Sequence, residues 1–272
     1  MSQNILQAIL ETKHKEVEAL RRKQDLAEWR RQALAAPRAR NFFAAVTRPP
    51  RRDLNLIAEV KKASPSAGVI RADFDPVDIA RRYAAAGADA LSVLTDEQYF
   101  QGRLEYLTRI REAVAVPLLR KDFIIDPCQV YESRIAGADA ILLIAAALSG
   151  GQLMDLMILA TELRMTVLVE VHGADELMHI RSMVGFPHAA YSLLGINNRD
   201  LTSFTVDLGT TVRLAQLAGE GAPLVSESGI KTRDDVRRLK AAGVTAALVG
   251  ETLMRCGDIA RGIDDLLGPA RQ

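Results

Sequence analysis

The sequence contains few of the residues that mark disulfide-rich or metal-binding proteins. Its 272 residues include only two cysteines, Cys128 and Cys256. Two cysteines so far apart give neither a disulfide framework nor the paired spacing of a zinc site. The four histidines show no metal-ligand spacing either: His14, His172, His179 and His188. We therefore expect no metal site, and the scarcity of cysteine indicates a reducing compartment, which we take to be the cytoplasm.

Long apolar runs, a secretory signal and a large net charge are also missing. The longest uninterrupted apolar run, residues 140–148, has nine residues, whereas a helix that spans a bilayer needs about 20. The first ten residues lack a basic stretch followed by an apolar one, so no signal peptide is indicated. The net charge of +1 gives the chain as a whole no reason to bind nucleic acid or a membrane.

The charge that is present is unevenly distributed. Residues 1–52 hold 12 Lys and Arg against 5 Asp and Glu, a balance of +7, so the remaining residues sum to −6. Apolar residues recur at a helical period through residues 2–35, and Pro37 ends the pattern. We predict one amphipathic helix here. A basic arm could attract an anionic ligand or contact RNA, but a solvated helix is the interpretation that we favour.

From residue 54 onward, short apolar runs alternate with helical patterns. The expected strands are residues 55–60, 90–94, 116–120, 140–144, 166–171, 192–196, 223–226 and 246–249. The expected helices are residues 77–86, 104–114, 128–135, 151–163, 174–183, 206–218, 233–242 and 252–255. This alternation is typical of βα units with parallel strands.

An internal repeat supports the same architecture. AGADALSV (86–93) and AGADAILL (136–143) are nearly identical, and AGVTAALV (242–249) is a looser copy. In each copy we expect the glycine to end a helix in a left-handed conformation before a buried strand. Eight such units form an α/β fold, the (β/α)8 barrel. The alternative is a doubly wound open sheet, and no Gly-x-Gly-x-x-Gly motif follows a strand to favour it. We expect one domain over residues 1–272, with residues 1–52 as a helical extension over the C-terminal rim and residues 53–272 as the barrel proper.

Polar residues follow seven of the eight expected strands. In a barrel the C-terminal ends of all strands meet at one rim, where ligands bind. Any one polar end is explained by solvation, but seven together favour a ligand site. The fourth strand is the apolar exception, ending in Leu142, Leu143 and Ile144. With Phe100 and Phe123, Leu143 would suit a flat aromatic ligand, and core packing is the equal alternative for Leu143.

The last two units suggest a phosphate site. Ser228-Gly229 and Gly250-Glu251 each lie between an expected strand and an expected helix. Free backbone N–H groups at such turns bind phosphate, because glycine leaves the approach open. Gly-containing turns are also common for structural reasons alone. The occurrence of two in consecutive units favours phosphate.

Four charged residues at the rim form a candidate acid–base set: Glu59, Lys61, Lys121 and Glu170. Lysines that are desolvated and close to other cations can have lowered pKa values and act as acids. The glutamates could accept protons or hold the lysines charged. The alternative is a structural ring of ion pairs at the barrel mouth.

Seven segments resemble those of the indole-3-glycerol phosphate synthase family. They are EVKKASPS (59–66), SVLTDEQYFQG (92–102), LRKDFIID (119–126), LVEVH (168–172), GINNRDL (195–201), SESGI (226–230) and LVGETLM (248–254). The resemblance covers nearly the whole chain, including the N-terminal helix. Residues 183–191 depart from it, since they look longer than usual before the sixth strand, and we expect an effect on loop geometry only.

The resemblance implies a cofactor-free lyase of tryptophan biosynthesis. Its substrate would be 1-(2-carboxyphenylamino)-1-deoxyribulose 5-phosphate, whose ring carbon attacks the ribulose C2 carbonyl before carbon dioxide and water are lost. Lys121 would be the general acid and Glu170 the base in the dehydration, with Lys61 near both the phosphate and the carboxylate. The other implied residues are Glu59 and Asn197 for positioning, Arg199 and Glu227 in support, Ser64 for the carboxylate, and Ser228, Gly229, Gly250 and Glu251 for the phosphate.

Two other functions are consistent with such a barrel. A phosphoribosyl-amine aldose–ketose isomerase would also need a phosphate site, but it requires one facing acid and base rather than two lysines and two glutamates. A non-catalytic ligand-binding barrel would bind the same molecule without converting it. The partner that we expect is a small anionic sugar phosphate with an anthranilate ring. We expect a monomer that binds neither nucleic acid nor a membrane.

Overall fold

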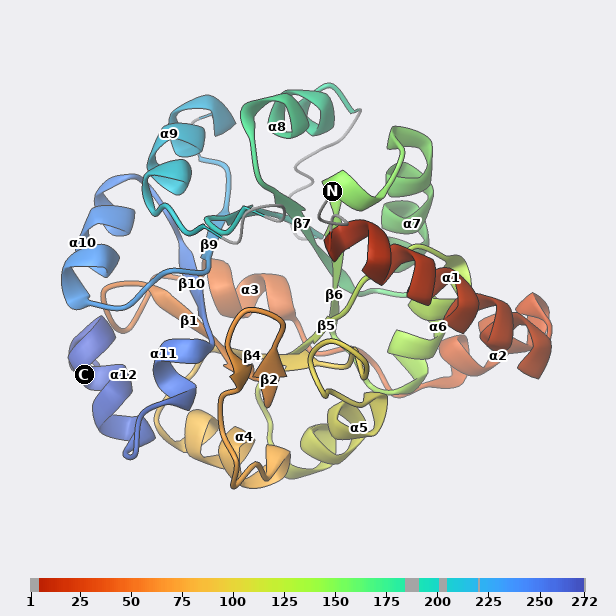
Figure 1. Cartoon of the computed structure of the whole chain (residues 1–272), viewed down its shortest axis with the longest axis horizontal. Coiled ribbons are helices and arrows are strands. Elements are labelled where there is room, and N and C mark those ends of the chain that lie inside the picture. The colour runs from red at the N-terminus through yellow and green to blue at the C-terminus, as the bar shows by residue number, and fades with distance from the viewer. Residues whose placement is uncertain (1–4, 184–190, 201–204, 220, 272) are drawn as a thin grey trace.

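The strands of the protein form a closed barrel in a computed structural model that describes residues 5–183, 191–200, 205–219 and 221–271. Eight parallel strands lie in chain order around the barrel, and the last pairs with the first (Figure 1). They are β1 (Asn55–Val60), β4 (Ala90–Leu94), β5 (Leu118–Lys121), β6 (Ala140–Ile144), β7 (Thr166–Val171), β8 (Ser192–Asn197), β9 (Leu224–Glu227) and β10 (Ala246–Val249). The predicted (β/α)8 barrel is confirmed, and the open sheet is wrong.

Helices surround the barrel, as Figure 1 shows. They are α4 (Pro76–Ala85), α5 (Leu104–Ala113), α6 (Pro127–Ile135), α7 (Gly150–Glu162), α8 (Ala174–Arg181), α9 (Gly209–Ala218), α10 (Arg233–Ala241), α11 (Glu251–Met254) and α12 (Ile259–Leu267), with a 3-10 turn η1 (Ala145–Ala147). The sequence prediction missed α12 and a small hairpin, β2 (Ala63–Ser64) with β3 (Gly68–Val69). None of the helices in the described part of the chain is long and apolar enough to cross a membrane.

The repeated Ala-Gly-Ala-Asp segments end a helix and fix the start of the next strand at β4 and β6. Gly87, Gly137 and Gly243 all have positive φ, which confirms the predicted left-handed caps. The aspartate two residues later closes the turn: Asp89 accepts a hydrogen bond from Leu56 N, as Asp139 does from Leu118 N. Each aspartate thus ties the start of its strand to the preceding strand.

Alternate residues of the strands build two separate apolar layers, because successive side chains of a strand point to opposite faces. The inner layer fills the barrel and includes Ile57, Leu119 and Leu142. The outer layer lies under the helices and includes Leu56 and Leu143. The direction of each strand-end side chain, into the barrel or toward a helix, follows from this alternation.

The predicted single helix over residues 2–35 is wrong, because it is divided. α1 (Ile5–Lys23) is followed by α2 (Leu26–Ala35), and Asp25 caps α2 by accepting a hydrogen bond from Glu28 N. An unexpected α3 (Phe42–Thr47) then packs against the N-terminal end of the barrel. Phe42 and Val46 are fully buried there in the inner layer.

α1 lies over the C-terminal rim, and Figure 1 shows it crossing from the barrel opening toward α2. Leu6 and Ile9 of α1 pack in the inner layer, and Lys13, whose side chain is only 2% exposed, adds buried ion pairs. Lys13 Nζ lies 2.9 Å from Asp96 Oδ2 and 2.9 Å from Asp122 Oδ1, at the ends of β4 and β5. Burial would lower the pKa of Lys13, but Asp122 and Asp96 outweigh it and raise that pKa. This cation of the basic extension therefore anchors α1 to the rim.

Candidate active site

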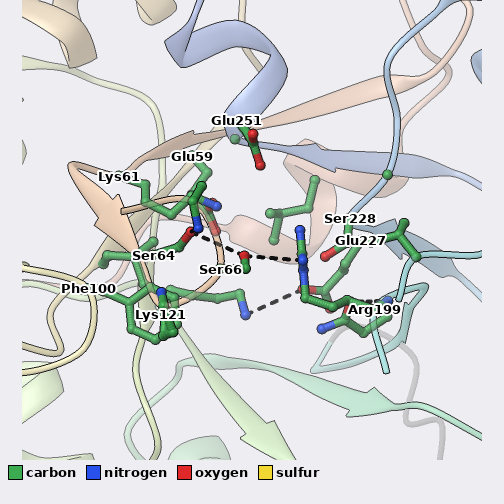
Figure 2. Close-up of a pocket in the computed structure, with 18 of the residues that line it drawn as sticks. Glu59, Lys61, Ser64, Ser66, Phe100, Lys121, Arg199, Glu227, Ser228 and Glu251 are labelled. Carbon is green, nitrogen blue, oxygen red and sulfur yellow. Dashed lines mark hydrogen bonds and ion pairs between the residues drawn. The ribbon is translucent and has the colours of Figure 1, made fainter. Parts of the chain in front are cut away.

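A cavity of about 860 Å³ opens at the C-terminal ends of the strands. Its walls come from strand ends, from the β2–β3 hairpin and from Ile5, Leu6 and Ile9 of α1. The lining contains these predicted site residues: Glu59, Lys61, Ser64, Phe100, Lys121, Phe123, Glu170, Asn197, Arg199, Glu227, Ser228, Gly229, Gly250 and Glu251. In Figure 2, Glu59, Lys61 and Lys121 extend from one side of this cavity, and Lys121 points toward Glu227 on the other side.

Leu143 is the predicted site residue that the structure places elsewhere. It is fully buried in the outer layer, and its neighbours Leu142 and Ile144 line the cavity instead. The prediction was wrong by one residue, which in a strand reverses the face. The apolar slot is therefore made by Leu142, Ile144 and the pair Phe100 and Phe123, whose ring centroids are 6.2 Å apart.

Lys121 reaches the centre of a cluster of carboxylates. Its Nζ lies 3.2 Å from Glu170 Oε2 and 3.6 Å from Glu227 Oε2. Burial would lower the pKa of Lys121, but Glu170, Glu227 and Glu59 outweigh it and raise that pKa above its usual value. Of the two possibilities that the sequence left open, the structure favours the one in which the glutamates hold Lys121 charged.

Glu170 and Glu227 are both buried and share Lys121, but they differ in charge. Burial would raise the pKa of Glu170, but Lys121 and then His172 outweigh it and hold that pKa well below its usual range. Burial and the negative charge of Glu170 raise the pKa of Glu227 to about 8. At neutral pH, Glu170 is thus an ionised base and Glu227 a protonated acid. Gly195 of β8 makes room for this arrangement, since a Cβ there would lie 2.5 Å from Glu227 Oε1.

The second lysine lies beside the predicted phosphate turns. Lys61 Nζ is 2.5 Å from Glu59 Oε2, and a Cβ on Gly250 would collide with that carboxylate. Glycine is therefore required for α11 to start this close to the ion pair. Glu251 pairs with Arg255 at 3.0 Å, so its negative charge is offset near the turn. The turn thus combines open backbone with a nearby cation, as a phosphate requires.

Ser228 and Gly229 form the other half of this region. Both have positive φ, 64° and 77°, and a Cβ on Gly229 would collide with Val206. Across the mouth, Arg199 Nη1 donates to Ser66 Oγ at 3.2 Å (Figure 2). Arg199 thereby bridges β8 and the loop after β1, and it brings a positive charge to the entrance.

Sequence reasoning missed several residues of this site. Asp122 was passed over although it follows Lys121, and together with Asp96 it holds Lys13 of α1. His172 was dismissed with the other histidines, yet its Nε2 lies 3.2 Å from Glu170 Oε1. The signal was its position two residues after Glu170, where the alternation of β7, if continued past its last residue, points the side chain to the same face. The expected departure at residues 183–191 mostly lies outside the described residues.

The described residues contain no group of three or more histidine, cysteine, aspartate and glutamate side chains that could hold a metal ion. The cations of the cavity are instead lysines and arginines. These lie on several strands, as the lining residues Lys61, Lys121 and Arg199 illustrate.

Comparison with solved structures relates the fold to other proteins. A structure named thiamine phosphate pyrophosphorylase from Pyrococcus furiosus matches with a TM-score of 0.54, over 79% of this chain and 95% of that one. Its sequence is only 16% identical, so this likeness speaks for the fold alone.

Comparison of sequences is more specific. A family model described as indole-3-glycerol phosphate synthase matches residues 6–266. Three relatives carry that name. The protein of Geobacillus kaustophilus is 51% identical over 264 residues, 97% of each chain. That of Halalkalibacterium halodurans is 47% identical over 264 residues, again 97% of each. That of Desulfotalea psychrophila is 48% identical over 275 residues, 98% of this chain and 99% of its own. The chain belongs to the indole-3-glycerol phosphate synthase family.

Proposed function

We propose that Lys121 and Glu170 carry the acid–base steps of indole-3-glycerol phosphate synthesis in this chain. The reaction closes the ring of 1-(2-carboxyphenylamino)-1-deoxyribulose 5-phosphate with loss of carbon dioxide and water. One observation carries the proposal: Lys121 Nζ and Glu170 Oε2 lie 3.2 Å apart in the cavity, between an apolar slot and two glycine-containing turns. A substrate with an aromatic ring at one end and a phosphate at the other fits between these regions.

Ring closure requires a general acid. The anthranilate ring is a weak nucleophile, so the ribulose C2 carbonyl must be polarised as the ring carbon attacks. Lys121 protonates the carbonyl oxygen as negative charge develops on it. The raised pKa of Lys121 keeps this proton in place in the free enzyme. Loss of carbon dioxide then restores the conjugation of the ring.

Dehydration requires a base and a leaving hydroxyl. Glu170 is ionised at neutral pH and removes the proton whose loss accompanies departure of water. Asn197 hydrogen bonds to Glu170 and fixes the direction of its carboxylate. Glu59 holds Lys61 in place at 2.5 Å, and Lys61 neutralises the substrate phosphate and carboxylate.

The remaining residues hold the two ends of the substrate. Backbone N–H groups at Ser228, Gly229, Gly250 and Glu251 bind the phosphate. Ser64 binds the carboxylate, and the ring lies between Phe100, Phe123 and the aliphatic side chains of β6. Holding both ends brings the ring carbon close to the carbonyl. The entropic part of the activation barrier is therefore lowered, because binding has already oriented the reacting groups.

Turnover of the carboxyphenylamino sugar phosphate tests the proposal. Carbon dioxide and indole fluorescence should appear together in the wild-type protein. Glu170→Gln should lower kcat by roughly a hundredfold or more with little change in KM, because an amide keeps the shape but is no base. A kcat close to wild type in Glu170→Gln would remove Glu170 from the acid–base set.

We also propose that the chain acts as a monomer in the cytoplasm, as one domain that joins the helical extension of residues 1–52, of which α1 covers the cavity, to the barrel of residues 53–272. Cys128 and Cys256 are free thiols, as a reducing compartment favours. Light scattering should give the mass of a single chain, and unfolding should show one cooperative transition. A dimer in light scattering or a separate melting of the extension would contradict this.

A further inference from the structure

His172 contacts the proposed base directly. It follows the last residue of β7, and its side chain is 12% exposed. Its Nε2 lies 3.2 Å from Glu170 Oε1, and its Nδ1 lies 3.4 Å from Glu176 Oε2 in the first turn of α8. Glu176 Oε2 also accepts a hydrogen bond of 2.8 Å from the backbone N–H of His172. The imidazole is thus held between two carboxylates, one inside the cavity and one outside it.

The two oxygens of Glu170 therefore face different cations. Oε2 faces Lys121 and Oε1 faces His172. The two cations differ in one respect that matters during turnover. Lys121 gives up its proton during ring closure, and its positive charge beside Glu170 is then lost. His172 takes no part in that transfer, so it remains the cation beside the base when the dehydration follows.

The groups around Glu170 offer it few other positive charges. Lys121 of β5 faces Glu170, Glu227 of β9 faces it as a protonated acid, and Asn197 of β8 hydrogen bonds to it. Glu59 of β1 adds further negative charge, which raises the pKa of both Lys121 and Glu227. Behind the imidazole, Glu176 of α8 supplies the second negative charge. If His172 were absent, neither of these two cations would lie beside the ionised Glu170 whenever Lys121 was neutral.

We propose that His172 is a positioning residue for Glu170, whose imidazolium, backed by Glu176, holds the Glu170 carboxylate ionised and fixed while Lys121 cycles through its neutral form. This rests on the proposed role of Glu170 as the base. Burial would lower the pKa of His172, but Glu170 and Glu176 outweigh it and raise that pKa to about 10. The ring is therefore charged at neutral pH.

Three variants with one control test this role. His172→Ala removes the ring, His172→Gln keeps an N–H donor without the charge, and Glu176→Gln removes the outer carboxylate. His179→Gln is the control, because His179 is exposed on the neighbouring α8. We expect kcat at pH 7 to fall about tenfold to a hundredfold in His172→Ala, the usual cost of losing a partner that orients a functional group. Glutamine should restore part of that loss, and Glu176→Gln should have a smaller effect.

The pH profile separates positioning from a general loss of structure. Without the imidazolium the pKa of Glu170 rises, so the acid limb of kcat should move upward by a pH unit or more in His172→Ala, while KM changes little. An unshifted acid limb, or a rise in KM alone, overturns the proposal. In the wild type, imidazole NMR should show His172 charged at pH 8, and a neutral ring there overturns it whether or not the variants fold.

The failure of this inference differs from failure of the proposed function. Adding His172→Ala to Glu170→Gln should cost no further activity, because the carboxylate that it supports is already gone. Full activity in Glu170→Gln alone would reject the proposed base. A large loss in Glu170→Gln, together with wild-type behaviour of His172→Ala, would reject His172 only.

Discussion

The two ends of the barrel both bury carboxylates, but they satisfy them differently. At the N-terminal end, Asp139 accepts hydrogen bonds from Leu118 N at 2.9 Å and from Arg111 Nη1 at 2.7 Å. At the C-terminal rim, Glu227 has Lys121 Nζ 3.6 Å away and faces the carboxylate of Glu170. The first arrangement satisfies the carboxylate with N–H donors and stabilises the fold. The second places two carboxyl groups against each other, at a cost in stability.

Substitution at the rim should produce the largest effect on rate. Lys121→Ala removes the proton donor, so kcat should fall by roughly a hundredfold or more, while the melting temperature falls because Glu170 and Glu227 lose their shared cation. Stopped-flow indole fluorescence and thermal unfolding measure the two quantities. Lys15→Ala on the exposed face of α1 is the control. A Lys121→Ala enzyme with near-normal kcat would mean that this end of the barrel does not perform the chemistry as described.

Substitution at the N-terminal end of the barrel should lower stability and leave the rate nearly unchanged. Asp139→Ala removes the acceptor that Leu118 N, Arg40 N and Arg111 Nη1 share, and we expect the free energy of unfolding to fall by about 4 kcal/mol. The kcat of the folded enzyme should stay within about twofold of wild type, because ligands bind at the other end of such a barrel. Urea unfolding compared with the exposed Asp155→Ala measures the loss. A strong fall in kcat with unchanged stability in Asp139→Ala would show that the N-terminal end contributes to catalysis and not to stability, against this account.

Lys13 tests the comparison between the two ends of the barrel. It lies at the C-terminal rim, but its charge is paired with Asp96 and Asp122. Lys13→Met leaves Asp96 and Asp122 without their shared cation, so stability should fall by about 3 kcal/mol. KM should also rise several-fold, since α1 covers the cavity through Ile5, Leu6 and Ile9. Denaturant unfolding and steady-state kinetics test both effects. If KM is unchanged although stability falls, α1 is a structural element and not a cover for substrate.

Glu227 should show the smallest effect, visible mainly in its pH dependence. Its folded pKa of about 8 lies above the unfolded value, so the folded state binds more protons between roughly pH 4.5 and 8. Stability should therefore decline as pH rises through that window. Glu227→Gln should remove this part of the decline and be more stable than wild type at pH 8. Equal pH dependence in the variant, or a gain matched by the exposed Glu162→Gln, would show that the buried carboxyl costs no stability.

The fold and most of the rim could be predicted from the sequence for a geometric reason. Parallel strands bring their C-terminal ends together, so Glu59, Lys121 and Gly250 could be assigned to one cavity from their order alone. The face of a strand is harder to assign, because an all-apolar strand such as β6 gives no alternation to read. Leu143 was misplaced for that reason, and Leu142 took its role.

The charge states could not be predicted, because they depend on distances between elements. The sequence places Lys121 among charges, but the three carboxylates around it decide the direction of its pKa shift. The division of the N-terminal helix was equally hidden, since Asp25 caps α2 within a continuous helical pattern. His172 gave only a weak signal, its spacing from Glu170, until the contact of 3.2 Å placed it beside the base.

A structure of the protein with indole-3-glycerol phosphate bound is the most direct test of the whole account. The phosphate should contact the backbone at Ser228-Gly229 and Gly250-Glu251, and the indole ring should lie against Phe100 and Phe123. Lys121 Nζ and the Glu170 carboxylate should both lie within hydrogen-bonding reach of the glycerol chain or the indole. A product molecule bound outside this cavity, or one within it that neither Lys121 nor Glu170 can reach, would contradict the account.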